Sequence, residues 1–422
     1  MGEPKYRSLR GMSDVLPGYS DKMRRVEDAA REVFSVYGFS EIRTPILEVT
    51  EVFTTGIGEN TDIVEKEMYT FSDRGGKSVS LRPEGTAPIM RAFIEHGLGN
   101  TPETVKLFYS GPMFRGERPQ KGRLRQFRQI GAETIGSSDP YADAELILTL
   151  ERMLRKLGVS EHTVFVNSLG CPEDRKKYAK ELSKYLNSHS GELCEDCVRR
   201  SRENVLRVLD CKVLSCKKVI AGAPVITGFL CGDCMGSYEE FKDTLTKEGV
   251  VFKEKSDLVR GLDYYTGIIF EVSHPSLGAQ DALAAGGRYD GLSSRMGGQP
   301  MSATGYAIGV ERLLLILPEA EALEGMTGMS VIPVEGPFKP GAFHLVERLR
   351  ALGYRCDMDL TGRSMKAQMR KAGKEKRDFV IFVDRDLEKD DRVSLKDMGT
   401  GEQEEISFDD LVEKMRKEEG RG

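Results

Sequence analysis

A strongly basic segment between two strand-like segments constrains the fold of this chain more than any other feature. Residues 105–114, VKLFYSGPMF, are rich in β-branched and aromatic side chains, and residues 124–135, LRQFRQIGAETI, alternate in character. Pro119 and Gly122 supply turn chemistry between them, so the pattern predicts a long antiparallel hairpin. A single acid, Glu117, accompanies the basic residues of the connection, which are Arg115, Arg118, Lys121, Arg123, Arg125 and Arg128.

Successive side chains of a strand point to opposite faces, so the returning strand can be divided by parity. One face carries Arg123, Arg125, Phe127, Gln129, Gly131 and Glu133. The opposite face carries Leu124, Gln126, Arg128, Ile130, Ala132 and Thr134. The first face suits a flat anionic ligand, with phosphates at the arginines, a base at the phenylalanine and a polar head at the far end. A polar edge hairpin with one incidental phenylalanine fits the same pattern, and parity alone does not decide between the two.

Length and composition set broad limits. A chain of 422 residues is too long for one simple core, so we expect two or three domains. Hydrophobic residues make up 39% and charged residues 31%, as in soluble globular proteins, and the net charge is −5. Nucleic-acid binding would therefore depend on local basic surfaces. The N-terminus lacks an apolar signal core and the longest apolar run, residues 313–317, cannot span a bilayer, so we expect no membrane segment and a cytoplasmic location.

The eight cysteines lack a secretory signal beside them, which argues against a disulfide framework. Six of them form three close pairs: Cys194 and Cys197, Cys211 and Cys216, and Cys231 and Cys234. Each Cys-x-x-Cys pair offers two thiolates at a spacing used by tetrahedral zinc sites. We therefore expect a structural zinc ion held by Cys194, Cys197, Cys231 and Cys234. Free buried thiols in a reducing cytosol are the alternative.

Hydrophobic periodicity predicts the main elements. Apolar residues at helical spacing indicate helices over residues 21–37 and 139–157, and another that begins near Thr86. Residues 39–49 indicate a strand or edge strand that contains Pro45. Beyond a boundary at 318–329, strands alternate with helices, which is typical of a small α/β domain with a largely parallel sheet.

The composition and the predicted secondary structure change between residues 171 and 255, which indicates an inserted domain. This region is helical, cysteine-bearing and locally basic, and the strand-rich pattern resumes after it at RGLDYYTGIIFEV. The expected domains are therefore a core of residues 1–170 and 256–325, the inserted domain 171–255, and a C-terminal domain 330–422.

Four further segments carry residues suited to a ligand site. LRPEGT places Glu84 and Thr86 where a strand turns into a helix, a position that suits an ammonium group. RGLDYYTG places Arg260 and two tyrosines before a strand, and GGRYDGL is a glycine-lined turn that lets backbone approach a ligand. GYAIGVERLLLIL leads from a strand into a helix with Arg312. Each segment alone is weak evidence, because a buried salt bridge would explain Arg312 as well as a phosphate contact does.

The common signatures of other enzyme classes are missing. The chain has no GxxxxGK[ST] loop and no strand-borne GxGxxG. Its five histidines are scattered without a nearby nucleophile pattern, which argues against a hydrolytic triad. The chemistry must therefore come from the arginine, glutamate and tyrosine segments described above.

Together these segments resemble the histidyl-tRNA synthetase family of class II aminoacyl-tRNA synthetases. FRGERPQKGRLRQFRQIGAE resembles motif 2, GYAIGVERL resembles motif 3, and TPILE resembles motif 1. RGLDYYTG and AAGGRYDGL resemble the two segments of the family's histidine pocket, and the match extends to LKDMGTGEQ near the end of the chain. The resemblance implies an α+β fold, in which an antiparallel sheet is flanked by helices, with a helical insertion and a C-terminal α/β anticodon-binding domain.

The resemblance also implies roles for individual residues. The histidine-binding residues would be Glu84, Gly85, Thr86, Gln129, Glu133, Tyr264 and Tyr265. Among them, Glu84, Thr86 and Gln129 would bind the amino group of histidine. Glu133 and Tyr265 would recognise its imidazole ring. The ATP-binding residues would be Arg115, Arg123, Phe127 and Arg312, with Phe127 stacked on adenine. Catalysis would depend on Arg260, at the histidine carboxylate and α-phosphate, and on Arg115.

The implied reaction needs no general base in its first step, because the carboxylate of L-histidine is already an anionic nucleophile. It attacks the α-phosphate of ATP, which is bound with Mg²⁺, and fixed guanidinium groups stabilise the developing charge. The histidyl group then passes to tRNA(His). The residues at the tip of the hairpin (Arg118, Gln120 and Lys121) would touch the acceptor end, and motif 1 would form the interface of a homodimer.

The same motifs leave other hypotheses for the function open. A non-catalytic regulatory paralogue, a subunit of ATP phosphoribosyltransferase in histidine biosynthesis, resembles this family but typically lacks motif residues and the anticodon-binding domain. A synthetase for threonine or proline shares motifs 2 and 3 but not RGLDYY and GGRYDGL. A tRNA-binding module would not need the pocket residues.

Overall fold

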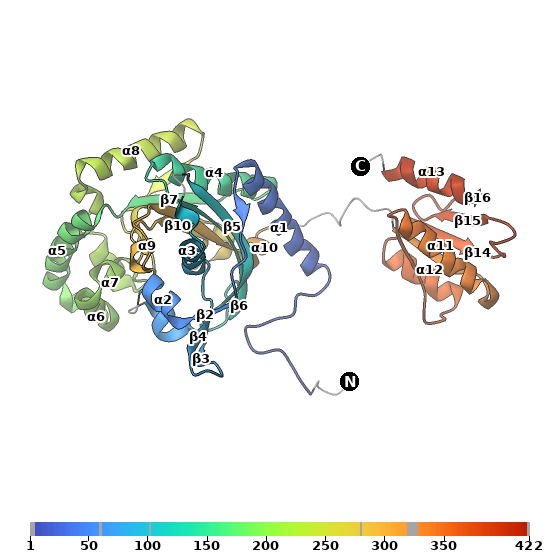
Figure 1. Cartoon of the computed structure of the whole chain (residues 1–422), viewed down its shortest axis with the longest axis horizontal. Coiled ribbons are helices and arrows are strands. Elements are labelled where there is room, and N and C mark those ends of the chain that lie inside the picture. Colours follow the sequence, from blue (N-terminus) through green and yellow to red (C-terminus); the bar gives the residue numbers. More distant parts are fainter. Residues whose placement is uncertain (1–4, 59–60, 101–102, 279–280, 319–327, 420–422) are drawn as a thin grey trace. The chain divides into compact units, whose positions relative to one another are not determined.

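The computed structural model describes residues 5–58, 61–100, 103–278, 281–318 and 328–419. The chain divides into two compact units, Met1–Pro318 and Glu319–Gly422 (Figure 1). The domain boundary expected at 318–329 falls mostly on residues 319–327, which lie outside the described residues. Within the described ranges, no helix combines the length and the apolar character needed to cross a bilayer.

An eight-stranded sheet forms the centre of the first unit. All neighbouring strands run antiparallel except the two edge pairs, β1 with β5 and β7 with β8. In spatial order the strands are β1 (Ser40–Glu41), β5 (Val105–Phe114), β6 (Gln126–Ile135), β11 (Ala303–Gly309), β10 (Ala282–Arg288), β9 (Thr266–Ser273), β7 (Thr163–Ser168) and β8 (Phe252–Glu254). The expected antiparallel sheet flanked by helices is confirmed.

The predicted hairpin is formed by β5 and β6, which pair from Val105 opposite Ile135 to Phe114 opposite Gln126. The connection turns at Gly122, whose φ of 73° is accessible to glycine at little cost. The ladder ends at Gln126, two residues later than the alternation suggests, because the N-terminal segment reaches this point. There the amide of Arg125 donates to the carbonyl of Gly11 at 2.7 Å.

One face of the sheet packs against α1 (Tyr19–Val36) and α4 (Pro140–Lys156), the helices predicted at 21–37 and 139–157. α4 begins where the sequence indicates, since Asp139 caps the amide of Tyr141 at 2.9 Å and Pro140 occupies the first turn. The short α10 (Val310–Leu314) lies on the same face. The buried core here joins helix and strand residues, for example Val26, Ile130, Leu150, Phe270 and Ile308.

The opposite face carries α3 (Thr86–Glu95), whose start agrees with the expected position, and the short α9 (Leu292–Arg295). Ile89 and Phe93 of α3 share a core with Tyr109 and Ile269 of the sheet. α2 (Thr50–Ile57) packs against α3. The expected strand at 39–49 is divided into β1 and β2 around Pro45, which has no amide hydrogen for a ladder. A small sheet completes this region, with β2 (Leu47–Val49), β4 (Ser78–Leu81) and β3 (Thr70–Ser72).

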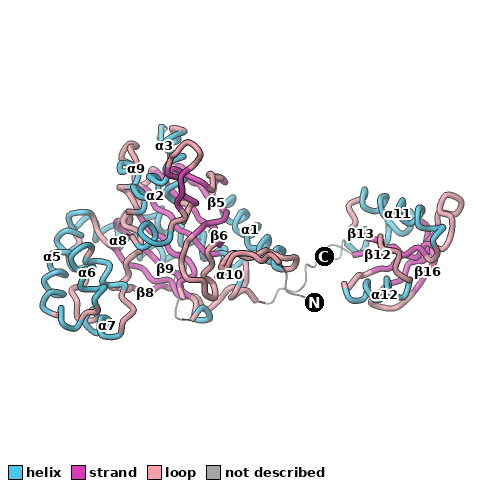
Figure 2. The backbone as a smooth tube through the Cα atoms, turned by 90° about the horizontal axis from the view of Figure 1, so that it is seen from below, coloured by secondary structure: helices cyan, strands magenta, loops and turns pink. Residues whose placement is uncertain are grey.

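The region expected to be an inserted domain leaves the sheet after β7 and returns at β8. It contains α5 (Pro172–Ser188), α6 (Glu195–Glu203), α7 (Leu214–Ile220) and α8 (Gly232–Lys247). Figures 1 and 2 show these helices gathered at one end of the unit, on the side of β8. Short helical turns link the larger elements: η1 (Ile63–Glu67), η2 (Leu98–Asn100), η3 (Ser190–Glu192), η4 (Val205–Asp210), η5 (Ile226–Phe229), η6 (Pro275–Leu277) and, in the second unit, η7 (Gly336–Phe338).

The second unit has a five-stranded sheet with helices on both faces. Its strands are, in spatial order, β13 (Arg355–Met358), β12 (Gly328–Pro333), β14 (Phe379–Val383), β15 (Arg392–Asp397) and β16 (Gln403–Ser407). Its helices are α11 (Lys339–Ala351), α12 (Met365–Lys374) and α13 (Phe408–Glu419). The first three strands are parallel, as expected, but β15 runs antiparallel to both of its neighbours, β14 and β16, so the sheet is mixed.

Candidate active site

The face of β6 that does not pack under α1 and α4 presents the expected ligand-binding side chains. Ile130 and Ala132 belong to the helix-covered core, which places Gln129 and Glu133 on the other face. β6 pairs with β11, where Gly309 lies opposite Gln129 and Gly305 lies opposite Glu133. The division by parity is therefore present in the structure.

Glu133 is the centre of a buried polar cluster and is 1% exposed. The hydroxyl of Thr86 donates to its Oε1 at 2.7 Å, and the hydroxyl of Tyr289 donates to its Oε2 at 2.5 Å. Burial raises the pKa of Glu133 to about 8, although the hydrogen bonds from Tyr289 and Thr86 favour the ionised form. A buried carboxyl group of this kind is suited to a ligand that brings N–H donors or a positive charge.

Gly305 provides the space that the Glu133 side chain occupies. A Cβ atom on Gly305 would lie 1.7 Å from Oε2 of Glu133, a separation that no side chain tolerates. The glycine of GYAIGVERL is thus required by the carboxyl group on the neighbouring strand.

Three tyrosines enclose the same region. Tyr264 and Tyr265 are buried, with ring centroids 4.7 Å apart, and the ring of Tyr289 meets Tyr264 edge-on at 5.6 Å. Arg175, from the start of α5, donates to the carbonyl of Tyr265 at 2.8 Å. The inserted region therefore helps to hold the tyrosine segment in place.

Glu84 and Gly85 stabilise the structure at the start of α3. The carboxylate of Glu84 accepts the amides of Thr86 at 2.7 Å and Ala87 at 2.9 Å, and so caps the start of α3. Burial raises the pKa of Glu84, and the bonds from Ala87 and Thr86 oppose that shift. Gly85 leaves room for an aromatic ring, because a Cβ there would lie 2.4 Å from the ring of Tyr109.

Two polar atoms at this place have no partner. Oε1 of Gln129 and the hydroxyl of Tyr109 are both buried and have no hydrogen-bond partner among the residues that the structure describes. Buried polar groups are normally hydrogen-bonded, so such atoms indicate the position of a ligand. The Gln129 oxygen is an acceptor and suits the ammonium group expected there.

Three arginines, two from the hairpin connection and one from α10, converge at the turn of the hairpin. Arg115 donates to the carbonyl of Pro83 at 2.9 Å and lies 5.3 Å from the ring centroid of Phe127. Arg123 pairs with Glu117 at 2.8 Å. Arg312 donates to the carbonyl of Gly122 at 3.1 Å.

The charges of these arginines act on one another. Burial lowers the pKa of Arg312, and the positive charges of Arg123 and Arg115 lower it further. Arginine remains protonated even so, and guanidinium groups held together in this way attract a polyanion. The alternative of an internal salt bridge for Arg312 is not observed, because its described hydrogen bonds go to backbone carbonyls.

Arg260 lies at the edge of a cavity of about 120 Å³, which Tyr265 also lines. Its Nη1 donates to Oε2 of Glu271 at 2.7 Å, while its Nε is buried and bonds to none of the described residues. Glu271 also borders a larger cavity of about 480 Å³ between β9 and the inserted helices. Arg260 is thus oriented by one carboxylate and still has a donor available for a ligand.

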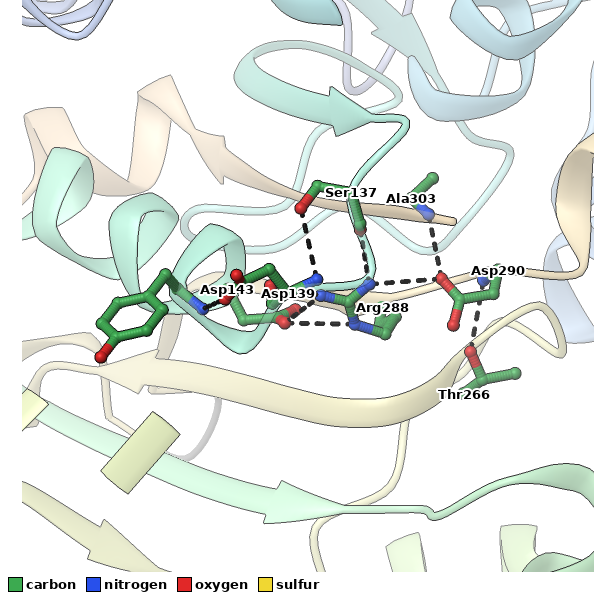
Figure 3. A network of polar contacts seen from close by, with 8 residues as sticks. Ser137, Asp139, Asp143, Thr266, Arg288, Asp290 and Ala303 are labelled. Atoms are coloured by element: carbon green, nitrogen blue, oxygen red, sulfur yellow. Dashed lines mark hydrogen bonds and ion pairs between the residues drawn. The ribbon is translucent and has the colours of Figure 1, made fainter. Parts of the chain in front are cut away.

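Arg288 anchors the segment GGRYDGL, which contains Tyr289, to α4 and to the residues that precede it (Figure 3). Its guanidinium forms an ion pair with the fully buried Asp143 of α4 and donates to the carbonyls of Ser137 at 2.8 Å and Asp139 at 3.1 Å. Asp290 continues the network and accepts the amide of Ala303 at 2.9 Å. The network fixes both flanks of Tyr289, the residue that donates to Glu133.

Sequence reasoning missed four residues of this site. Tyr289 lies in GGRYDGL, a segment that the resemblance assigns to the histidine pocket without a role for this residue, and Tyr109 lies in the first strand of the hairpin, for which no ligand contact was predicted. Glu271 and Arg175 carry no local signal, because their partners Arg260 and Tyr265 are distant in sequence. Glu271 lies in β9, 11 residues after Arg260, so a search for acids in the strand that follows Arg260 would have identified it as a candidate partner.

The cysteines expected to share one zinc ion do not lie together. In the described part of the chain, Cys194 and Cys197 group with Cys211 and Cys216, whereas Cys231 and Cys234 group with Cys171 and Asp174. The expected set of Cys194, Cys197, Cys231 and Cys234 is therefore corrected. The reason is that the two Cys-x-x-Cys pairs begin different helices, α6 and α8, which face different neighbours.

Comparisons with known proteins agree with this geometry. Residues 11–174 and 247–313 match the family model described as histidyl-tRNA synthetase, and residues 329–418 match the model of an anticodon binding domain. The chain is similar to the histidine–tRNA ligase of Halothermothrix orenii, with 45% identity over 415 residues that cover 97% of this chain and 99% of the relative. It is also similar to the histidine–tRNA ligase of Desulforudis audaxviator, with 46% identity over 411 residues that cover 97% and 98%.

A solved structure has a similar fold. The crystal structure of apo S. aureus histidyl-tRNA synthetase is 34% identical, has a TM-score of 0.82 and covers 97% of this chain and 99% of its own.

Proposed function

The chain belongs to the histidyl-tRNA synthetase family, and we propose that it is a histidine–tRNA ligase that activates L-histidine with ATP and transfers the histidyl group to tRNA(His). The observation that carries the proposal is the single face of β6, where the buried Glu133 and the unpartnered Gln129 lead towards three convergent arginines. A polar amino acid and a polyphosphate would be bound side by side along that face.

Selectivity for histidine rests on Glu133. Its carboxyl group accepts hydrogen bonds from Thr86 and Tyr289, and an imidazole N–H would provide a further donor. Tyr265, buried beside it, supplies the second contact to the ring. A site built from buried polar groups rejects analogues that leave those groups unpaired, by roughly 10⁴–10⁵.

The amino group of histidine would be bound by Gln129, with Glu84 and Thr86 beside it. The unpartnered Oε1 of Gln129 is a free acceptor. Each oxygen of Glu84 already accepts one backbone amide but retains further acceptor capacity. This set of acceptors would place the carboxylate of histidine towards Arg260.

Activation would then occur by attack of the histidine carboxylate on the α-phosphate of ATP, which forms histidyl-adenylate and breaks the bond to the β-phosphate, so that pyrophosphate leaves. Arg260 would stabilise charge at the carboxylate and α-phosphate, and Arg115, Arg123 and Arg312 would hold the phosphates. Phe127 would support adenine. Mg²⁺ would arrive with ATP and neutralise phosphate charge. The protein would contribute mainly position and fixed positive charge.

The tRNA would be bound by both units. Arg118, Gln120 and Lys121 at the hairpin tip are exposed and suited to the acceptor end. The C-terminal unit, which matches the anticodon-binding model, would read the anticodon. The presence of that domain and of the motif arginines favours a synthetase over the regulatory paralogue, and the substrate implies a cytoplasmic location.

A homodimer is part of the proposal. Ile46 and Leu47, in the motif 1 segment, are 42% and 41% exposed, as apolar residues of an interface would be in a single chain. A symmetric pair is the commonest assembly that would cover them. Sedimentation velocity of the full chain tests this point, since a monomer at micromolar concentration contradicts it.

Amino-acid-dependent exchange of pyrophosphate into ATP tests the proposed activity. The purified chain is assayed with each of the common amino acids in turn, in the presence of Mg²⁺. We expect exchange with histidine only. Exchange with another amino acid, or with none, would contradict the proposal.

A further inference from the structure

The inserted helices contain two groups of metal-ligating side chains that take no part in the active site. The ligand atoms within each group lie within 4.8 Å of one another. The first group is Cys194, Cys197, Cys211 and Cys216, and the second is Cys171, Asp174, Cys231 and Cys234. Together they use all cysteines of the chain except Cys356, which lies in the C-terminal unit.

The first group has the geometry of a single tetrahedral ion. Sγ of Cys194 lies 3.9 Å from Sγ of Cys211, far beyond a disulfide bond. With zinc–sulfur distances of about 2.3 Å, a tetrahedron places its sulfur atoms about 3.8 Å apart. Cys197 and Cys216 are fully buried, so an ion here would be enclosed. An iron–sulfur cluster with several iron atoms would hold its four thiolates farther apart than 4.8 Å, the separation within which these four sulfur atoms lie.

The backbone around the first group favours thiolates. Cys194 is the N-cap of α6 and Cys197 lies in its first turn, where the positive end of the helix stabilises negative charge. The amide of Cys194 also donates to Sγ of Cys216 at 3.2 Å. Such amide donors are the usual outer partners of metal-bound sulfur.

The second group is marked by an unpartnered buried oxygen. Asp174 is completely buried. Its Oδ2 accepts the amides of Cys231 at 3.1 Å and Cys171 at 3.4 Å, whereas its Oδ1 has no hydrogen-bond partner in the described part of the chain. A buried carboxylate oxygen without a donor is costly unless a cation binds it. Three thiols lie within reach of that carboxylate.

The two groups share one local design. Cys171 and Cys231 are the N-caps of α5 and α8, as Cys194 is of α6, and in each case the second ligand follows three residues later in the first turn. In the second group two such helix starts meet. The repetition of this arrangement explains the spacing of the three pairs at helix starts, which are Cys-x-x-Cys or Cys-x-x-Asp, whereas Cys211 and Cys216 are spaced differently.

We propose that each group binds one zinc ion, and that the two ions hold the inserted helices together. The first ion would tie the start of α6 to Cys211, directly after η4, and to Cys216 in α7. The second would tie the start of α5 to the start of α8, across the whole insertion. Tetrahedral sites with three or four thiolates select zinc over harder cations.

Both ions would also support the wall of the active site. Arg175 follows Asp174 directly and donates to the carbonyl of Tyr265. Near the first group, Asn204 donates to Oδ1 of Asp263 at 3.1 Å. Loss of either ion would therefore loosen contacts to the segment that carries Arg260 and the tyrosine pair.

Metal analysis of the full chain, purified without chelator, tests the proposal. We expect two zinc ions per chain, one for each group. Protein that contains neither zinc nor, after reconstitution, cobalt would overturn it. Bound iron in place of zinc would overturn the assignment of the ion.

Cobalt reconstitution of the unmodified chain gives a second test, independent of any variant. Tetrahedral thiolate sites produce intense cobalt d–d bands and thiolate-to-cobalt charge-transfer bands. We expect these bands to saturate at two cobalt ions per chain. Saturation at one ion would overturn one of the two sites.

Variants separate the sites. Cys216→Ser should lower the zinc content to one ion per chain, and so should Asp174→Asn, while the control Cys356→Ser should leave two. If a variant does not accumulate as folded protein, stepwise zinc release from the unmodified chain by a mercurial reagent replaces it. Release in two equal steps supports the proposal, and a zinc content unchanged in Asp174→Asn contradicts the second site.

Discussion

Arg260 and Glu271 form a hydrogen-bonded ion pair, in which Nη1 lies 2.7 Å from Oε2. The two residues come from different segments: Arg260 precedes β9, and Glu271 lies within it. Both side chains are largely buried, with exposed fractions of 19% and 16%. The carboxylate thus fixes the orientation of the arginine proposed to act at the α-phosphate, while the other side of the guanidinium remains available.

We expect Glu271 to act through Arg260 and not by contact with the substrate, so its substitution should impair catalysis. We expect Glu271→Ala to lower kcat of histidine-dependent exchange by about 10²-fold, since small misplacements of a catalytic group have effects of this size. KM for histidine should change much less. Glu254→Gln, an exposed acid at the end of β8, serves as control. Equal effects of both variants would contradict the positioning role.

The raised pKa of Glu133 predicts a pH-dependent stability. The unfolded carboxyl group has a pKa near 4.5 and the folded one about 8, so the folded chain retains the proton more strongly. The contribution of Glu133 to stability is therefore complete below pH 4.5 and is lost as pH rises through about 8. Glu133→Gln cannot ionise and should lack this loss.

We expect the Tm of the unmodified chain to fall relative to that of Glu133→Gln as pH rises from 6 to 8.5, in the absence of histidine. Differential scanning fluorimetry in matched buffers measures the difference. Parallel curves for the two proteins would show that the carboxyl group does not titrate in this range.

Gly305→Ala should displace Glu133, because the added Cβ would lie 1.7 Å from its Oε2. Overpacking of this kind costs about 1–3 kcal/mol in stability. The moved carboxyl group should also raise KM for histidine. Gly291→Ala is a matched control in the pocket segment, since its Cβ would meet nothing within 4 Å. A histidine KM that stays unchanged in Gly305→Ala would contradict the proposed role of Glu133.

Local patterns predicted the elements of the fold well. Helix periodicity and the cap at Asp139 identified α4, and alternation identified the β5–β6 hairpin and its two faces. These features depend on residues close in sequence, which a chain reveals directly. The motif segments then predicted that Glu133, Gln129 and the arginines belong to one ligand-binding site.

Contacts between distant residues could not be predicted in the same way. Tyr289 donates to Glu133 from 156 residues away, and nothing in either segment specifies that pairing. The cysteines show the same limit. Cys-x-x-Cys spacing identifies ligands that share a helix start, but which two starts meet depends on how α5, α6 and α8 pack. Asp174 was missed because an aspartate in a first helical turn is ordinarily a cap.

The ion pair between Arg288 and Asp143 should contribute strongly to the stability of the first unit. Asp143 is fully buried, so its removal leaves an uncompensated buried charge, at a cost of about 3–5 kcal/mol. We expect Asp143→Ala to lower the unfolding free energy accordingly in urea titrations. The exposed pair of Glu181 with Lys184 is the control, and Glu181→Ala should cost less than about 1 kcal/mol. Similar costs for both variants would contradict the anchoring role of Arg288.

The division of the chain at Pro318 predicts that the two chemical steps can be separated. All residues proposed to bind histidine and ATP lie in the first unit, Met1–Pro318, which has its own cores. A fragment of residues 1–318 should therefore retain histidine-dependent pyrophosphate exchange within about threefold of the full chain, a difference of less than 1 kcal/mol. It should lose most of its charging of tRNA(His), because the anticodon-binding unit is missing. Full-length chain assayed in parallel is the reference. Loss of exchange from a fragment that still unfolds cooperatively would show that the C-terminal unit is needed for activation itself.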